Sequence, residues 1–246
     1  MDSSALLWIA LLMAVAAALY SSVGHGGASA YLAIMALFAV APETMRPTAL
    51  ALNLVVAGFG TARYALAGKT NWRLLAAFVV TAAPAAFVGG WVSIPPDLYR
   101  PLVGLLLWLA ALRLFWQPKS LAERPVRMPP LAVALPAGAG LGLLAGLTGT
   151  GGGIFLSPLI ILFHWEEPRR TSGVAAAFIF INSAAGLAGN VAAVQALPSE
   201  LPVLAAAVAG GALLGTWLGV DRLPRDRLLQ ALGLVLAIAG FKLIFT

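Results

Sequence analysis

The stretch "GLTGTGGGIFLSPLIILF", Gly146 to Phe163, places five glycines among eight residues within an otherwise apolar run. Glycine is a poor helix former because it loses more backbone freedom on folding than any other residue. A bilayer tolerates non-helical backbone only where protein buries it or where it lines a water-filled cavity. The run therefore predicts a deliberate break in a helix at membrane depth.

The composition of the chain is that of an integral membrane protein. Its 246 residues are 61% hydrophobic and only 10% charged, and the mean hydropathy is +0.95. Apolar stretches long enough to span a bilayer recur along the whole chain, which leaves no room for a separate soluble domain. The chain has no cysteine, which excludes disulfides and thiolate metal sites. We assign the net charge of +6 to loops between helices and expect no nucleic-acid partner.

Ten apolar segments are separated by glycine, proline and charge clusters. They are Ala5–Val23, Ala28–Val40, Pro47–Ala67, Trp72–Ile94, Leu98–Trp116, Leu131–Leu147, Ile154–Trp165, Thr171–Leu197, Leu201–Val220 and Leu228–Phe245. Most approach the roughly 20 residues that a spanning helix needs. The second and seventh are too short to cross comfortably, and each directly follows a glycine-rich turn.

The distribution of basic residues predicts the orientation. With the polar interval Gln117–Pro130 in the cytoplasm, twelve of the 15 lysines and arginines fall inside or at the inner boundary. Only Arg46, Arg100 and Lys242 fall outside. By the positive-inside rule, we expect a multi-pass protein of the bacterial inner (plasma) membrane with both termini outside.

The two halves of the chain resemble each other. "IPPDLYRPLVGLLLWLAALRLF" from Ile94 aligns with "LPRDRLLQALGLVLAIAGFKLI" from Leu223, and Asn53 aligns with Asn182 at the same spacing. The predicted division is a first membrane repeat (1–116), a cytoplasmic linker (117–130) and a second membrane repeat (131–246). Five segments per repeat is an odd number, so the second repeat enters from the opposite side. We therefore expect an all-α protein of two inverted-topology repeats, each with a short re-entrant helix after its glycine turn.

The glycine turns are the candidate substrate site. Each turn begins a helix, so unpaired N–H groups and the positive end of the helix dipole point into it. Such helix starts bind anions, and neutral hydroxyls and amides nearby can complete the site. The predicted substrate-binding residues are Ser21, Ser22, Gly24, His25, Gly26, Gly27, Asn53, Thr148, Gly149, Thr150, Gly151, Gly152, Gly153 and Asn182.

Other readings of these residues stay open. Glycines spaced by four, at Gly138, Gly142 and Gly146, are typical of close helix packing rather than of a site. His25 is as compatible with a structural role as with anion contact or proton transfer. The two asparagines fit hydrogen bonding between helices as well as substrate contact.

The acidic residues fall in loops or at segment edges, without the carboxylate at membrane depth that proton- or sodium-coupled carriers often keep. The sequence also contains no His/Asp/Glu cluster with metal spacing and no nucleophile with a paired base. We therefore expect no enzyme activity, no catalytic residues, no metal and no cofactor. An inside-negative potential favours expulsion of one negative charge by about 2.3 kcal/mol per 100 mV, so uncoupled export of an anion is feasible.

Together these features resemble the sulfite exporter TauE/SafE family of membrane permeases. The resemblance rests on the duplicated glycine turn, on the run from Gly146 with its following Pro158, and on the asparagine-containing segments after each short helix. In the first half, His25 and Ala28 interrupt the glycine run and Ala33 stands where the second half has Pro158. The resemblance implies transport, usually export, of sulfur-containing anions such as sulfite, thiosulfate, sulfoacetate or related organosulfonates.

We accordingly expect an exporter of a small sulfur-containing anion that works by alternating access around a site at the membrane midplane. An anion channel and a non-transporting membrane scaffold or assembly factor are the alternatives. The expected partners are the anionic substrate and the lipid bilayer, with association into a homo-oligomer left open.

Overall fold

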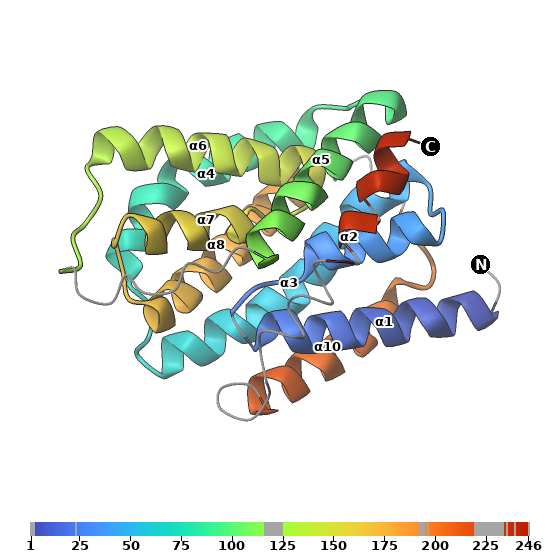
Figure 1. Ribbon diagram of the computed structural model, residues 1–246, viewed down its shortest axis with the longest axis horizontal. Helices are drawn as coiled ribbons and strands as arrows, with labels where there is room; N and C mark the ends of the chain where they lie inside the picture. Colours follow the sequence, from blue (N-terminus) through green and yellow to red (C-terminus); the bar gives the residue numbers. More distant parts are fainter. Residues whose placement is uncertain are drawn as a thin grey trace.

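The computed structural model describes residues 3–22, 24–115, 125–191, 195, 197–218, 234, 236–238 and 240–245. Every regular element within these ranges is an α-helix, which confirms the predicted all-α class (Figure 1). The helices are α1 (Ser3–Ser21), α2 (Ala28–Leu37), α3 (Pro42–Leu66), α4 (Trp72–Trp91), α5 (Pro96–Phe115), α6 (Leu131–Thr148), α7 (Gly153–Leu162), α8 (Pro168–Gly189) and α10 (Leu201–Leu218). A further short apolar helix is Leu236–Phe245.

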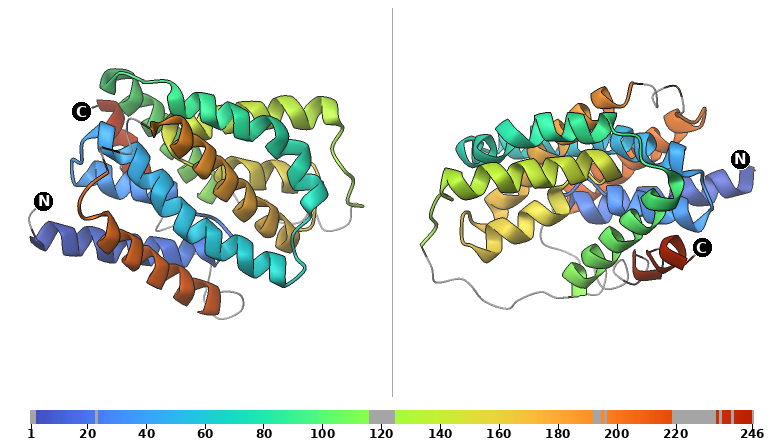
Figure 2. Two further views of the ribbon diagram at one scale, coloured as in Figure 1. Left: turned by 180° about the vertical axis from the view of Figure 1, so that it is seen from behind. Right: turned by 90° about the horizontal axis from the view of Figure 1, so that it is seen from above.

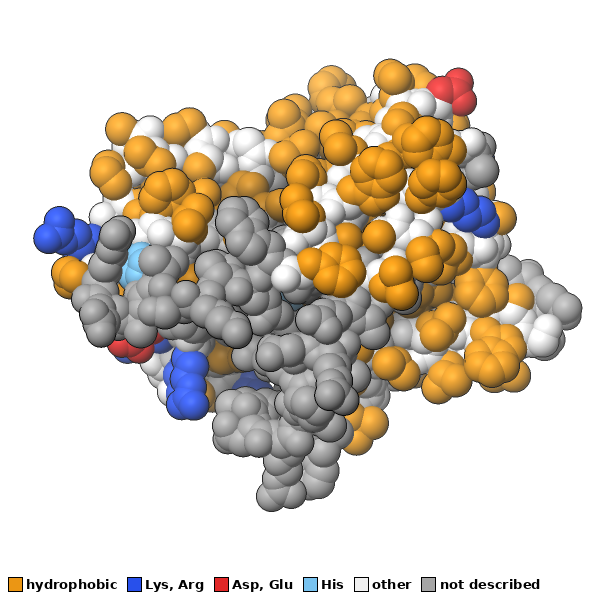
Figure 3. Space-filling model, in the orientation of Figure 1, with side chains coloured by type: hydrophobic (Ala, Val, Ile, Leu, Met, Phe, Trp, Pro, Cys, Tyr) orange, Lys and Arg blue, Asp and Glu red, His pale blue; other side chains and the backbone are white. Residues whose placement is uncertain are grey.

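Five of the described helices, α1, α3, α4, α6 and α8, are long and apolar enough to cross a membrane. The helices α2 and α7 have 10 residues each, or about 15 Å at 1.5 Å per residue. This is half of a hydrocarbon core of about 30 Å, so the predicted shortness of these two segments is confirmed. In Figure 3 the described side chains between the two ends of the molecule are mostly hydrophobic, as expected for a surface that faces lipid.

Two helix boundaries differ most from the sequence prediction. Helix α3 begins at Pro42 rather than Pro47, because proline suits the first helical position, where its missing N–H would have no partner. Helix α8 ends at Gly189 with Asn190 as its C-cap, so the eighth segment does not continue as one helix to Leu197. Most of the predicted linker, and the stretch where the ninth segment ends and the tenth begins, lie outside the described residues.

The helices pack in three neighbouring pairs (Figures 1 and 2). Helices α3 and α8 contact each other in the centre, α4 packs on α6 along one side, and α1 packs on α10 along the other. Helix α4 also contacts α8, and α10 also contacts α3. The short helices α2 and α7 lie on α3 and α8 respectively. The three pairs α3–α8, α4–α6 and α1–α10 each join a helix from the first half of the chain to one from the second. The contacts α2–α3 and α7–α8 each lie within one half.

Glycines allow the lateral pairs to approach closely. Gly138, Gly142 and Gly146 of α6 lie directly against the carbonyls of Phe78, Ala82 and Ala86 of α4. Gly211 and Gly215 of α10 lie in the same way against Ala14 and Ala18 of α1. The packing interpretation of Gly138, Gly142 and Gly146 is confirmed, and Gly211 and Gly215 pack in the same way.

Replacing Gly142 with alanine is expected to destabilise the protein by about 1–3 kcal/mol, because overpacking a close contact forces the backbones apart. The matched control is Gly140→Ala in the same helix, where an added Cβ meets nothing within 4 Å. Thermal unfolding in detergent measures both. Equal melting temperatures for the two variants would show that the α4–α6 contact does not depend on glycine.

Hydrogen bonds that involve a charged side chain stabilise both ends of α4. Arg46 on α3 is only 6% exposed, and it donates hydrogen bonds to the carbonyls of Gly89, Gly90 and, at 3.0 Å, Val92. At the other end, the N-cap residue Asn71 donates to the buried carboxylate of Glu166. A cation at the C-terminus and an anion at the N-terminus both complement the helix dipole, so α4 is fixed at each end.

Candidate functional site

Both glycine turns adopt backbone conformations that require glycine. In the first turn, φ is +77° at Gly24 and +93° at Gly27. In the second, φ is +83° at Gly149, +73° at Gly151 and +76° at Gly152. These left-handed conformations are available to glycine without steric penalty and are unfavourable for residues with a Cβ. The glycine clusters are therefore set by local geometry and not only by helix packing.

The turns present two helix N-termini without side-chain caps. Gly27 is the N-cap of α2 and Gly152 is the N-cap of α7, and neither helix start receives a side-chain capping hydrogen bond. The first N–H groups of an α-helix have no partner within the helix. Because backbone N–H groups and the positive dipole end coincide there, each start has the character of an anion site.

The two turns meet at the same pair of side chains. A Cβ added at Gly26 would lie 2.9 Å from the Cγ2 methyl of Ile179, and a Cβ added at Gly151 would lie 2.9 Å from the same methyl. Asn53 lies against both glycines, with its amide oxygen toward Gly26 and its amide nitrogen toward Gly151. The structure thus brings together Gly26, Asn53 and Gly151 from the predicted set.

Each turn also packs against a helix from the other half of the chain. Gly24 lies against the backbone of Ser172 on α8, and a Cβ there would be 2.7 Å from the Ser172 carbonyl oxygen. Gly149 lies against the backbone of Arg46 on α3, at 3.0 Å from the carbonyl oxygen by the same measure. The contacts are reciprocal, so α3 and α8 together form the support on which both turns rest.

The hydrogen-bonding groups of two buried amides near the turns are only partly satisfied by the described residues. Asn53 and Asn182 are both fully buried. The Asn53 amide donates a long hydrogen bond of 3.4 Å to the Ser183 hydroxyl, while its oxygen and both amide atoms of Asn182 have no partner among the described residues. Leaving such a group unsatisfied costs about 1–3 kcal/mol, and each instance in a native protein needs an explanation such as a ligand or water.

Two buried hydroxyls on the short helices also lack a hydrogen-bond partner among the described residues. The Tyr31 hydroxyl on α2 and the Ser157 hydroxyl on α7 have no partner within the described part of the chain. The Tyr31 oxygen lies 2.7 Å from the position of a Cβ on Gly27, so it points at the first turn. Sequence reasoning did not identify Tyr31 as a candidate, because an aromatic residue in a short apolar helix has no distinctive signal.

Several predicted hydroxyls are engaged elsewhere. Ser21 donates to the carbonyls of Ala18 and Ala212, each at 3.3 Å, which ties the end of α1 to α10. Ser22 donates to the Leu19 carbonyl at 2.7 Å. These two side chains therefore contribute to helix ends, and their donor hydrogens do not point toward the meeting of the turns.

The threonines of the second turn stabilise the turn itself. Thr148 donates to the Leu144 carbonyl at 2.6 Å, and its oxygen lies 3.0 Å from the Thr150 oxygen. The remaining glycines of this turn pack on α8: Gly152 lies against Phe178, and Gly153 lies against Ile179.

His25 lies in the first turn, half-buried. Its ring is 6.4 Å from the Tyr20 ring in an edge-to-face arrangement, and Tyr20 in turn shares a 2.8 Å hydrogen bond with Ser29. The histidine is thus attached to an aromatic and hydroxyl cluster beside the first turn. Among the described residues, no group of histidine, cysteine, aspartate or glutamate side chains could hold a metal ion.

Ile179 and Ser183 were also missed by sequence reasoning. Ser183 follows Asn182 directly, and this polar pair within an apolar segment is a signal that could have identified it. Ile179 is indistinguishable in sequence from any lipid-facing isoleucine, and only the fold shows that both turns touch it.

These features define a multi-helix membrane protein in which two glycine turns converge on buried, unpartnered polar groups. The chain belongs to the TauE/SafE sulfite exporter family, because the family model "Sulfite exporter TauE/SafE" matches residues 9–243. It is also 37% identical, over the full length of both chains, to a protein of Sinorhizobium fredii (strain NBRC 101917 / NGR234) described as "Probable membrane transporter protein y4hK". No solved structure matches the chain.

Proposed function

We propose that the protein exports a small sulfur-containing anion, such as sulfite, sulfoacetate or a related organosulfonate, by alternating access. The substrate binds between Gly24–Gly27 and Gly149–Gly153. The observation that carries this proposal is the convergence of both turns on Asn53 and Ile179. Because the turns begin α2 and α7, two helix starts approach the same two side chains.

A neutral site of this kind suits a transporter better than a site with fixed cations. Helix N-termini and amide groups attract an anion. Without a salt bridge to a lysine or arginine, the bound anion can also be released. Tyr31 and Asn182 supply further neutral groups, for which the described part of the chain offers no hydrogen-bond partner. With an inside-negative potential favouring expulsion by about 2.3 kcal/mol per charge per 100 mV, export needs no coupling ion.

The packing pattern supports two inverted repeats. If α1–α5 correspond to the segments from α6 onward, the α4–α6 pair corresponds to the α10–α1 pair, and the α4–α8 contact corresponds to α10–α3. The reciprocal contacts of Gly24 with Ser172 and Gly149 with Arg46 follow the same correspondence. In this arrangement α2 and α7 are re-entrant helices that approach the midplane from opposite faces.

The glycine contacts also suggest which units move. Close backbone packing joins α8 as well as α6 to α4, and it joins α1 to α10, so we expect α4, α6 and α8 to move as one body and α1 and α10 as another. Alternating access then shifts the α1–α10 pair against the α4–α6–α8 group. We place the protein in the bacterial inner membrane with both termini outside, on the distribution of its basic residues.

Reconstitution into liposomes tests the proposal. We expect saturable efflux of sulfite, thiosulfate or sulfoacetate that follows the membrane potential and needs no proton or sodium gradient, with sulfate and taurine as comparison solutes. Efflux that requires an opposing ion gradient would contradict uncoupled export, and single-channel conductance would identify a channel instead. Absence of any flux, together with loss of partner association in Gly152→Leu, would favour the scaffold.

A further inference from the structure

The loops that follow the two short helices have the same backbone geometry and lie at opposite ends of the molecule (Figure 1). After α2, φ is +54° at Ala39, and after α7 it is +56° at His164. The next N–H group bonds back to the preceding helix in each case, from Val40 to α2 and from Trp165 to α7, at 2.9 Å. The loops therefore occupy equivalent places in the two halves, and their side chains can be compared directly.

The α7–α8 loop (residues 163–167) is anchored on α4 by two buried side chains. Trp165 is 7% exposed, and its ring centre lies 5.7 Å from that of Phe78 on α4. The buried carboxylate of Glu166 accepts a hydrogen bond from the side chain of Asn71, the N-cap of α4. An apolar contact and a charged hydrogen bond thus close this end of the molecule.

Packed side chains extend from this loop to the second glycine turn. Trp165 belongs to one hydrophobic cluster with Val174 and Phe178 of α8, both of which are fully buried. Phe178 in turn lies against Gly152, the N-cap of α7. The turn is therefore covered on the side of the α7–α8 loop.

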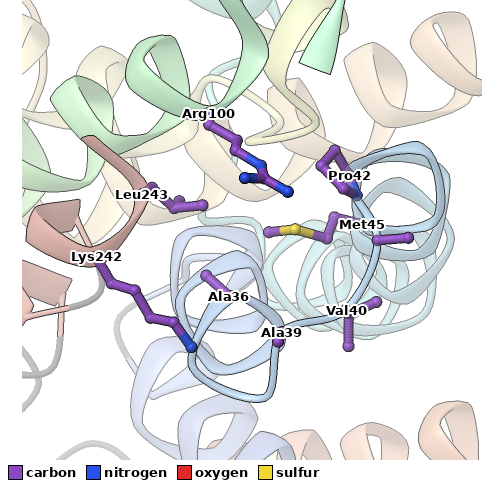
Figure 4. A pocket seen from close by; sticks show the side chains of 9 residues that line it. Ala36, Ala39, Val40, Pro42, Met45, Arg100, Lys242 and Leu243 are labelled. Carbon is purple, nitrogen blue, oxygen red and sulfur yellow. The ribbon is translucent and has the colours of Figure 1, made fainter. Parts of the chain in front are cut away.

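The α2–α3 loop, by contrast, carries small side chains and borders two cavities. Where the other loop has Trp165 and Glu166, this loop has Val40 and Ala41, and alanine has no side-chain group that can form a hydrogen bond. A cavity of about 480 Å³ is lined by this loop, by α1 and by the residues just before α10. A smaller one, of about 140 Å³, shares Ala39, Val40 and Ala41 with it (Figure 4).

The helix start opposite each loop differs in the same way. Glu200 immediately precedes α10, as Asn71 immediately precedes α4. Asn71 donates across its loop to Glu166. Glu200 instead lines the larger cavity, and the Ser199 hydroxyl donates to its carboxylate at 3.1 Å. The helix start that touches the loop at one end of the molecule faces a cavity at the other.

We infer that the α7–α8 loop is a gate, closed in this conformation by the Asn71–Glu166 hydrogen bond, and that the α2–α3 face is the more open of the two. The hydrogen bond must break, and Trp165 must leave Phe78, before the second turn can be reached from the gated face. On the predicted topology that face is cytoplasmic. The inference rests on the proposed alternating access, in which one face closes while the other opens.

Thiol labelling of the full-length protein tests the gate without a transport assay. The chain has no cysteine, so one introduced thiol is the group that N-ethylmaleimide modifies. Val174→Cys probes the gated face, because Val174 is buried in the Trp165 cluster and cysteine is the smaller side chain. Thr44→Cys probes the opposite face, because Thr44 lines the larger cavity. In detergent solution we expect slow labelling of the first thiol and faster labelling of the second.

Asn71→Asp separates the gate from the helix cap. The new carboxylate still accepts from the Leu74 N–H, as the Asn71 side chain does, but it cannot donate to Glu166 and repels it. We expect labelling of Val174→Cys to rise about tenfold, the value of one charged hydrogen bond. Adding Glu166→Gln exchanges donor and acceptor, because the glutamine amide donates to the new carboxylate while its oxygen still accepts from the Glu167 N–H. Labelling should then return to near the starting rate.

Glu166→Ala is a second test, because it gives this loop the alanine of the other loop and keeps the Asn71 cap. It is expected to raise labelling of Val174→Cys to a similar extent, and labelling of Thr44→Cys should rise in none of these variants. No change at Val174→Cys, a rise that Glu166→Gln does not reverse, or a parallel rise at Thr44→Cys would overturn the inference.

Liposome efflux separates this inference from the export proposal. Anion efflux in a protein whose Val174→Cys labelling ignores Asn71→Asp would refute the gate and leave export standing. A reversible rise in labelling without any efflux would leave the closing contact standing and refute export alone.

Discussion

Gly151→Ala is expected to reduce anion efflux from liposomes by about a hundredfold, which corresponds to about 2.7 kcal/mol. The alanine would have to adopt φ of +73°, a left-handed conformation that costs about 1–2 kcal/mol for a residue with a Cβ. Its methyl would also lie 2.6 Å from the Asn53 amide nitrogen and 2.9 Å from Ile179. Both effects displace the second turn from its meeting with the first.

The control for backbone strain is Gly68→Ala. Gly68 also has a positive φ, of +66°, but an added Cβ meets nothing within 4 Å. We expect this variant to retain near-normal efflux with a small loss of stability. If Gly151→Ala transported like Gly68→Ala while folding normally in gel filtration, the meeting of the turns would not be the substrate site.

The largest loss of stability is expected from Arg46→Met. The methionine fills a similar volume but leaves the carbonyls of Gly89, Gly90 and Val92 without their donor. The hydrogen bonds to Gly89 and Gly90 are buried, and each buried acceptor left unsatisfied costs about 1–3 kcal/mol, so we expect a total of about 3 kcal/mol. Thermal unfolding in detergent should show a melting temperature lowered by several degrees, by the general relation between free energy and melting temperature.

Arg63→Met on the same helix is the matched control, since Arg63 is exposed and surface substitutions usually change stability by less than about 0.5 kcal/mol. Arg46→Lys is expected to fall between the two, because one ammonium cannot reproduce the fork of the guanidinium. An Arg46→Met protein as stable as Arg63→Met would mean that the end of α4 is held by packing alone.

Much of the fold could be predicted from local sequence. The glycine turns, the short helices after them and the close-packed glycines of α6 and α10 all follow from properties of single residues or short spacings. A glycine-rich break in a helix and a helix too short to span are both local properties, so the sequence near Gly151 was enough to predict them, whereas the left-handed conformations are seen only in the structure. The start of α3 was wrongly predicted at Pro47, because a proline often marks the beginning of a helix. The helix begins at Pro42, and Pro47 lies inside it.

The candidate site was only partly accessible in this way. Asn53 was predicted, yet its neighbours Ile179 and Ser183 come from a helix more than a hundred residues later in the chain. Ser21 and Ser22 were predicted for their hydroxyls, but their donor bonds go to nearby backbone carbonyls. Competition from backbone acceptors cannot be judged until the neighbouring helices are in place.

An all-helical membrane protein with helix breaks at two glycine turns could be predicted from the residues alone, because hydropathy and backbone freedom are properties of the residues concerned. The contact of both turns with Asn53 and Ile179, and the hydrogen bonds from Arg46 to the end of α4, are visible only in the folded structure. Each of these contacts joins residues distant in the chain, and their distances depend on how whole helices pack.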